Sequence, residues 1–128
     1  MKGGARRWKR SAVTSKPRRS ATAAARQAAP VFAALGDQTR LYIVASLSAR
    51  GPMSIVALTT GSGVTRQAVS KHLQVLLNAG LVRLQRAGRE TRWELDREPL
   101  DAARDSLEQI ATQWDQALER LKAFVESS

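Results

Sequence analysis

Five polar side chains between residues 66 and 74 recur at the spacing of one helix face: Arg66, Gln67, Ser70, Lys71 and Gln74. All five donate hydrogen bonds, and Arg66 and Lys71 are cationic. A helix that enters the major groove of DNA needs such donors for base edges and phosphates. The chemistry that this segment favours is therefore contact with DNA.

The neighbouring residues predict a helix over about residues 65–78. Thr65 can accept a hydrogen bond from a first-turn backbone N–H, and Gly80 favours the helix end. The side of the helix opposite the polar residues is apolar at helical spacing, with Val69, Leu73, Leu76 and Leu77. The predicted helix thus has a buried inner face and a basic outer face.

A shorter helix is predicted just before this one. Ser54 can cap it, and we expect Ile55, Val56 and Leu58 to turn inward. The Gly61-Ser62-Gly63 segment then allows a sharp turn. A short helix, a tight turn and a longer helix form a helix-turn-helix. Two ordinary packed helices are the alternative, but they would not require a cationic outer face.

Two alternating segments, residues 81–86 and 90–95, flank Gly88 and predict a β-hairpin after the basic helix. Arg86, Arg89 and Arg92 fall at or near its tip. From there a short loop could reach the minor groove or the flanking phosphates, as the wing of a DNA-binding domain does. A solvated hairpin tip is the alternative.

Upstream, the chain becomes helical from Ala28, and Asp37 can cap a further helix that Gly51-Pro52 ends. We expect that helix to be mostly core, through Leu41, Ile43, Val44 and Leu47. The predicted fold is therefore mainly α with a small β-hairpin, in the order α-α-α-α-β-β-α of a winged helix-turn-helix.

The last predicted helix, from Pro99 to about Glu126, carries an apolar seam. Leu100, Leu107, Trp114 and Leu121 lie seven residues apart. A seam this long exceeds what a small domain covers, so we predict pairing with a second copy, and folding back on its own core is the alternative. The predicted dimer interface comprises Leu100, Leu107, Ile110, Trp114, Leu118 and Leu121. A two-fold dimer would present two reading helices to successive major grooves.

The net charge of +10 is unevenly distributed. Residues 1–27 contain nine Lys or Arg and no acid, residues 64–93 carry a net charge of +5, and residues 94–128 one of −5. We predict that residues 1–27 are a disordered basic arm and that residues 28–128 form one domain. The arm could add non-specific DNA affinity, serve only as a solubilising tail, or act as a transit peptide.

The composition argues against catalysis and metal binding. The chain has no cysteine and one histidine, His72. It offers no nucleophile–base pair and no glycine-rich phosphate loop, so we expect no enzyme, no cofactor and no metal. Asp101, Asp105 and Glu108 share a helix face, but exposed carboxylates at this spacing are usually solvated. No membrane span is visible, and the absence of cysteine is compatible with the cytoplasm.

Three stretches of the chain carry a resemblance to a known family. They are Leu35-Gly36-Asp37-Gln38-Thr39-Arg40-Leu41, Val69-Ser70-Lys71-His72-Leu73, and Ala79-Gly80-Leu81-Val82 with Gly88-Arg89 beyond it. Over about residues 30–96 the chain resembles the ArsR/SmtB family of bacterial winged helix-turn-helix repressors. Two features depart from that family. The cysteine and histidine sets of its metal sensors are absent, and Ser62 replaces a large apolar residue.

The resemblance implies a homodimer joined through the first and last helices, which represses by occupying an operator until a signal weakens binding. Carried over by position, the DNA contacts fall on Thr65, Arg66, Gln67, Ser70, Lys71 and His72. We expect His72 to pack and to bond a phosphate or backbone group, and a pH-sensing role is its alternative.

The function predicted from the sequence is a homodimeric, sequence-specific repressor that binds a palindromic operator. An architectural nucleoid-type protein with little sequence preference is the first alternative. A protein-interaction module that uses the last helix is the second.

Overall fold

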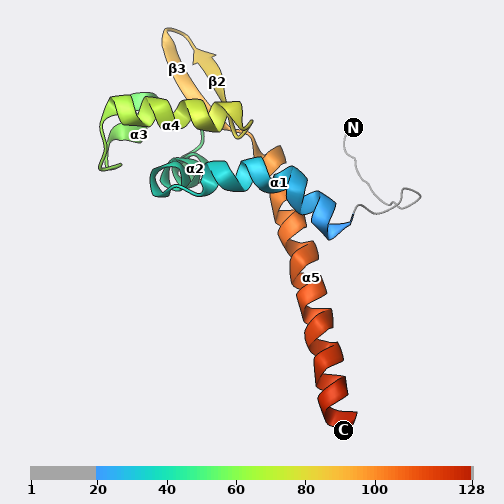
Figure 1. Ribbon diagram of the computed structural model, residues 1–128. Coiled ribbons are helices and arrows are strands. Elements are labelled where there is room, and N and C mark those ends of the chain that lie inside the picture. The colour runs from blue at the N-terminus through green and yellow to red at the C-terminus, as the bar shows by residue number, and fades with distance from the viewer. Residues whose placement is uncertain (1–19, 128) are drawn as a thin grey trace, which may run out of the picture.

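A computed structural model describes residues 20–127 as a helical body with a hairpin and a long helix projecting from it in opposite directions (Figure 1). In chain order the elements are α1 (Ala21–Leu35), α2 (Gln38–Arg50), α3 (Ile55–Thr59), α4 (Arg66–Asn78), β2 (Val82–Ala87), β3 (Glu90–Leu95) and α5 (Arg97–Ser127). This is the predicted α-α-α-α-β-β-α order, which is confirmed. No helix within residues 20–127 combines the length and the apolar character needed to cross a membrane.

Local hydrogen bonds set where the helices begin. The hydroxyls of Ser54 and Thr65 each accept a first-turn N–H at 3.1 Å, and the Asp37 carboxylate accepts two, at 2.9 and 3.0 Å. Side chains that satisfy these otherwise unbonded donors stabilise the first turn. At the other end of α4, Gly80 has a φ of +78°, a conformation open to glycine, and lets the chain turn into the hairpin. The three predicted caps are confirmed.

The core lies where α2, α3 and α4 meet the start of the hairpin. Its fully buried apolar side chains are Ile43, Leu58, Val69, Leu73, Leu76 and Leu81. Each such side chain contributes about 1.5–3 kcal/mol when it is removed from water. The inner face predicted for α4 is therefore the part of this helix that holds it to the body, and Leu77 is only partly buried at its edge.

Two residues expected in the core are on the surface instead. Leu41 is 53% exposed and Val56 is 58% exposed. Each lies two residues before a fully buried side chain, Ile43 in α2 and Leu58 in α3. Two residues correspond to about 200° of helical rotation, so the earlier side chain must point away from the core.

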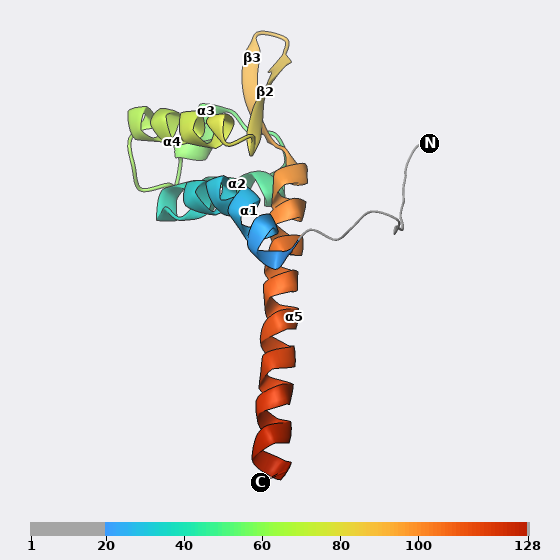
Figure 2. The same cartoon turned by 45° about the vertical axis from the view of Figure 1, so that its right-hand side comes forward.

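Helix α1 begins earlier than expected, so the predicted boundary at residue 28 is wrong. Residues 21–27 form its first turns, and the Ser20 hydroxyl accepts the Ala23 N–H at 3.1 Å. Ala21 and Ala28 are buried, and α1 packs against α5 (Figure 2). Alanine favours helix and its small side chain permits close helix packing, so residues 21–27 join the helix although they include no large apolar residue. Residues 1–19 of the predicted arm lie outside the described residues.

The hairpin is anchored to the body at its base. Strands β2 and β3 pair antiparallel, with Leu84 opposite Trp93. Met53 exchanges two backbone hydrogen bonds with Trp93, at 3.0 and 2.7 Å, and Trp93 packs against the core. Because its base is bonded to the segment before α3, the hairpin has a defined direction relative to α4.

Helix α5 leaves the body after its first turns. Ala103 and Ser106 are buried, and Leu100 packs on the core of its own chain. Leu100 therefore serves the core of one chain, unlike the other residues predicted for the dimer interface. Those are all exposed: Leu107, Ile110, Trp114, Leu118 and Leu121.

Candidate DNA-binding surface

The outer face of α4 is open to solvent. The structure exposes every residue that the sequence placed there: Arg66, Gln67, Ser70, Lys71 and Gln74. Helix α4 lies on the side of the body from which the hairpin projects, and α5 leaves on the other side (Figures 1 and 2). Helix α4 and the hairpin can therefore meet one ligand together.

The cations of this face have no carboxylate partner. Neither Arg66 nor Lys71 forms an ion pair within residues 20–127. Thr65 is exposed, although its hydroxyl oxygen accepts the capping hydrogen bond. Gln74, at the far end of the face, donates to Asn78 Oδ1 at 3.1 Å. The basic charge of α4 is thus available to phosphates.

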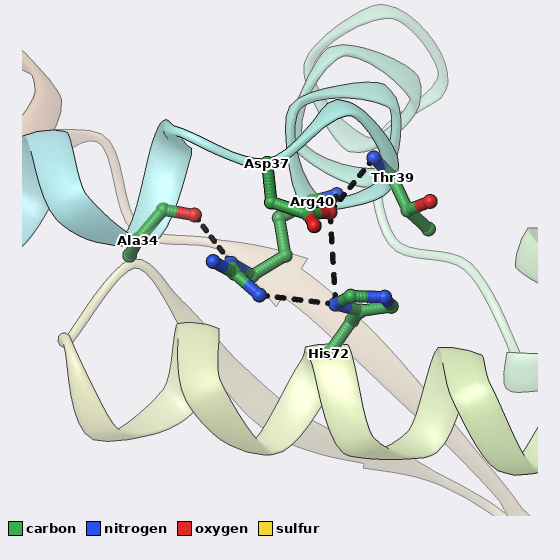
Figure 3. Close-up of polar contacts among 5 residues, drawn as sticks. All are labelled: Ala34, Asp37, Thr39, Arg40 and His72. Atoms are coloured by element: carbon green, nitrogen blue, oxygen red, sulfur yellow. Dashed lines mark hydrogen bonds and ion pairs between the residues drawn. The ribbon is translucent and has the colours of Figure 1, made fainter.

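His72 lies apart from these residues. Its ring points from α4 toward the start of α2, with Nδ1 3.2 Å from Arg40 Nη1 and 3.8 Å from Asp37 Oδ1 (Figure 3). Its side chain is only 22% exposed. In this structure His72 thus contacts the start of α2, whereas the resemblance implied a DNA contact for it.

Arg40 and Asp37 are tied into the same group of contacts. Arg40 Nε donates to the Ala34 carbonyl at the end of α1, at 2.6 Å. The hydrogen bond from the backbone N–H of Arg40 holds the pKa of Asp37 below its usual value of 3.8. In the sequence, Asp37 and Arg40 belong to one family motif and His72 to another, and neither motif by itself predicts that these side chains meet. Only the presence of both motifs in one chain could have indicated the contact.

The three arginines predicted at the wing tip are exposed but do not form one cluster. Arg89 lies in the turn and follows Gly88, which has a φ of +66°. Arg86 is paired opposite Thr91 and Arg92 opposite Gln85, so they lie on different faces of the hairpin. Arg92 Nε also donates to Glu90 Oε1 at 2.9 Å.

A fourth arginine of the hairpin, Arg83, pairs with two carboxylates. Arg83 Nε donates to Glu94 Oε1 at 3.1 Å, and its Nη1 lies 3.6 Å from Asp96 Oδ2. The hydrogen bond to Glu94 raises the pKa of the Arg83 guanidinium. Of the wing cations, Arg86 and Arg89 are the ones without a carboxylate partner in the described part of the chain.

Known proteins share this arrangement. A helix-turn-helix domain model matches residues 35–85. YuzN of Bacillus subtilis, described as an uncharacterized HTH-type transcriptional regulator, is 41% identical over 76 residues, which cover 55% of this chain and 83% of that protein. The solved structure of an ArsR-like transcriptional regulator from Rhodococcus sp. RHA1 is 38% identical with a TM-score of 0.68, and the match covers 77% of this chain and 92% of that one. The chain belongs to the ArsR family.

This ArsR-family protein is therefore a DNA-binding transcriptional regulator with a winged helix-turn-helix fold. A further solved structure, a possible ArsR-family regulator domain named Mb0332 from Mycobacterium bovis, is described as homodimeric. It is 29% identical, with a TM-score of 0.54 and coverage of 84% of this chain and 95% of that one. The family identity confirms the resemblance first seen in the motifs.

Ser62, the departure from the family pattern, has a structural role in this ArsR-family chain. Its hydroxyl donates to the Thr59 carbonyl at 2.7 Å and accepts the Val64 N–H at 3.2 Å. Both bonds lie within the turn between α3 and α4. A polar side chain here holds the turn by local hydrogen bonds.

No group of three or more His, Asp or Glu side chains within residues 20–127 is arranged to hold a metal ion. Asp101 Oδ1 lies 3.7 Å from Arg104 Nη2 on the same helix of this ArsR-family regulator.

Proposed function

We propose that this ArsR-family regulator is a homodimeric repressor that binds a palindromic operator through α4 and the wing. The observation that carries the proposal is the outer face of α4, where Arg66 and Lys71 are exposed and form no ion pair within residues 20–127. Helix α4 lies on the side of the body from which the hairpin projects (Figure 1). Direct contacts are proposed for Thr65, Arg66, Gln67, Ser70 and Lys71, with Arg86, Arg89 and Arg92 from the wing. A regulator of this kind acts where bacterial DNA lies, so we expect it in the cytoplasm, associated with the nucleoid.

An exposed apolar stripe supports the homodimer. Leu107, Ile110, Trp114, Leu118 and Leu121 of α5 are between 44% and 63% exposed. A continuous apolar surface of this kind usually marks an interaction site. The homodimeric domain from Mycobacterium bovis indicates a second copy as the partner.

Two-fold symmetry then leads to the palindrome. A symmetric dimer presents its two reading helices in opposite orientations, so each reads the same half-site on opposite strands. Half-site centres about 10 bp apart, or a multiple of this distance, would place both helices in major grooves on one side of the duplex.

Selection of DNA by the full chain tests this proposal. Duplexes bound from a random-sequence pool would be sequenced after several rounds and compared with a pool carried through without protein. We expect an inverted repeat to be enriched, with half-site spacing near one helical turn. Enrichment of no sequence, despite binding, would contradict sequence-specific repression.

The architectural alternative is favoured by one observation: eight of the 21 Lys and Arg residues lie in residues 1–19. Deleting residues 1–19, which keeps the Ser20 cap and all of α1, discriminates between the two functions. A repressor should keep its sequence preference with some loss of affinity for every duplex. A DNA-coating protein should lose most of its binding.

A further inference from the structure

Asp37, Arg40 and His72 form a contact group, the α2–α4 cluster, that joins three helices (Figure 3). Arg40 Nε donates to the Ala34 carbonyl in the last turn of α1, at 2.6 Å. Its Nη1 lies 3.2 Å from His72 Nδ1 in α4. Arg40 therefore connects the end of the helix that packs on α5 to the middle of the helix that presents the DNA-binding face.

The chemistry of the Arg40–His72 contact requires a neutral imidazole. A guanidinium group has only donors, so His72 Nδ1 must accept and the ring proton must lie on Nε2. A second ring proton on Nδ1 would place two donors, both positively charged, against each other at 3.2 Å. The acceptor then available to Nδ1 is Asp37 Oδ1, now 3.8 Å away. Protonation thus exchanges the contact with Arg40 for one with Asp37.

The charged side chains that contact His72 within residues 20–127 are Asp37 and Arg40, both at the start of α2. Its neighbour on α4, Lys71, is exposed on the DNA-binding face. One anion and one cation therefore face the imidazole, and only the cation lies within hydrogen-bond distance of it.

We propose that Arg40 is a positioning residue for the DNA-reading helix: through neutral His72 it holds α4 against the end of α1, and protonation of His72 releases this link and lowers the affinity for DNA. This inference rests on the proposed function of the outer face of α4. Protonation of His72 would therefore lower the affinity for DNA, whereas protonation of a histidine that contacts a phosphate would raise it.

Because the chain has one histidine, the direction in which DNA affinity changes with pH can test this proposal. His72 is the one histidine of the chain, and between about pH 8 and pH 5.5 imidazole is the side chain that normally changes charge. The lowered pKa of Asp37 keeps that carboxylate ionised through this range. In a His72→Gln variant the amide oxygen can accept from Arg40 at every pH, so the link does not depend on protonation. Any pH dependence of DNA affinity that remains in this variant comes from other groups, such as the terminal amine.

The experiment measures fluorescence anisotropy of the full chain on the duplex selected by the wild type, at constant salt from about pH 8 to pH 5.5. We expect the wild-type affinity to fall about tenfold as the pH is lowered. His72→Gln should bind with little dependence on pH. Arg40→Gln should bind about tenfold more weakly than wild type at the higher pH and also show a flat profile.

Arg50→Gln is the matched control for Arg40→Gln. It removes one positive charge from the exposed far end of α2 and leaves the cluster intact. We expect it to keep the pH profile of the wild type. Far-UV circular dichroism of every variant at both pH limits checks that the fold is kept, and the ¹⁵N shifts of the His72 ring at high pH should show a proton on Nε2 alone.

Two results would overturn the inference. One is wild-type affinity that rises or stays constant at low pH, and the other is an equal fall in wild type and His72→Gln. Wild type that binds no duplex at any pH would instead contradict the proposed function, so the two failures are distinguishable.

Discussion

Single side chains in this ArsR-family regulator combine structural and electrostatic roles, and Asp37 is the clearest case. Its carboxylate accepts the N–H groups of Thr39 and Arg40 at the start of α2. These hydrogen bonds favour the ionised form, and the folded-state pKa is lowered. The ionised carboxylate therefore stabilises the fold at pH values above its unfolded pKa, and this contribution is lost as the pH falls through the lower, folded value.

We expect the free energy of unfolding of the wild type to fall more steeply below about pH 4 than that of Asp37→Asn. Asparagine can still cap the helix but has no charge to lose. Urea denaturation at a series of pH values checks this. Asp115→Asn is the control: it removes an exposed carboxylate from α5, and its free energy of unfolding should vary with pH as that of the wild type does. If the free energy of Asp37→Asn ran parallel to that of the wild type, the ionised Asp37 carboxylate would not be the group that stabilises the fold.

At the scale of elements, α4 divides its two faces between stability and recognition. Val69, Leu73 and Leu76 are fully buried, while Arg66 and Gln67 lie exposed in the first turn. In helix-turn-helix proteins the N-terminal residues of the reading helix are those that reach base edges. The two ends of the outer face should therefore differ in what they contribute to specificity.

Replacing Gln67 or Arg66 with Ala should cost about 1–3 kcal/mol on the selected duplex and relax the preference at particular base pairs. Gln74→Ala is the matched control, since Gln74 lies on the same face but at the far end, bonded to Asn78. Titration against the selected and a scrambled duplex decides the matter. Equal losses of the Gln67 variant on both duplexes would refute base reading by that residue.

The wing should act differently from α4. Arg89 lies in an exposed turn without a carboxylate partner among the described residues, so we expect it to bind phosphates. Arg89→Ala should weaken binding to all duplexes evenly and reduce the salt slope by about one. Arg83→Ala, which removes a cation already paired with Glu94 and Asp96, should change the slope much less. An unchanged slope for Arg89→Ala would exclude the phosphate contact.

At the scale of the whole molecule, the long α5 carries an apolar stripe away from the body (Figure 1). Within one described chain most of this stripe has no covering surface, and Phe124 at its far end is 72% exposed. Burying it against a second copy would remove these exposed apolar side chains from water.

Introducing Asp at both Leu107 and Leu118 should therefore yield monomers, because each change places a charge in an apolar seam. Sedimentation velocity measures the outcome. Gln113→Asp with Gln116→Asp adds the same charge on another, polar side of α5 and should leave the dimer intact. Dimers that persist in the leucine variant would place the seam elsewhere, and a monomeric wild type would favour a protein-interaction module with a different partner.

Local sequence by itself determined the type of each element and where most of the helices begin. The caps at Asp37, Ser54 and Thr65, the helical repeat of α4 and the glycine after it act within a few residues, so they can be recognised along the chain. The family motifs extended this to the order of elements and to the DNA-binding function. The polar face of α4 followed from helical periodicity alone.

Tertiary structure decided which side of each element is covered. Leu41 and Val56 face solvent and Leu100 faces its own core because the packing of neighbouring helices selects which apolar side chains of each helix are buried. The contact of His72 with Arg40 joins residues 32 positions apart. Such contacts depend on how separate helices pack, and no spacing along the chain encodes that distance.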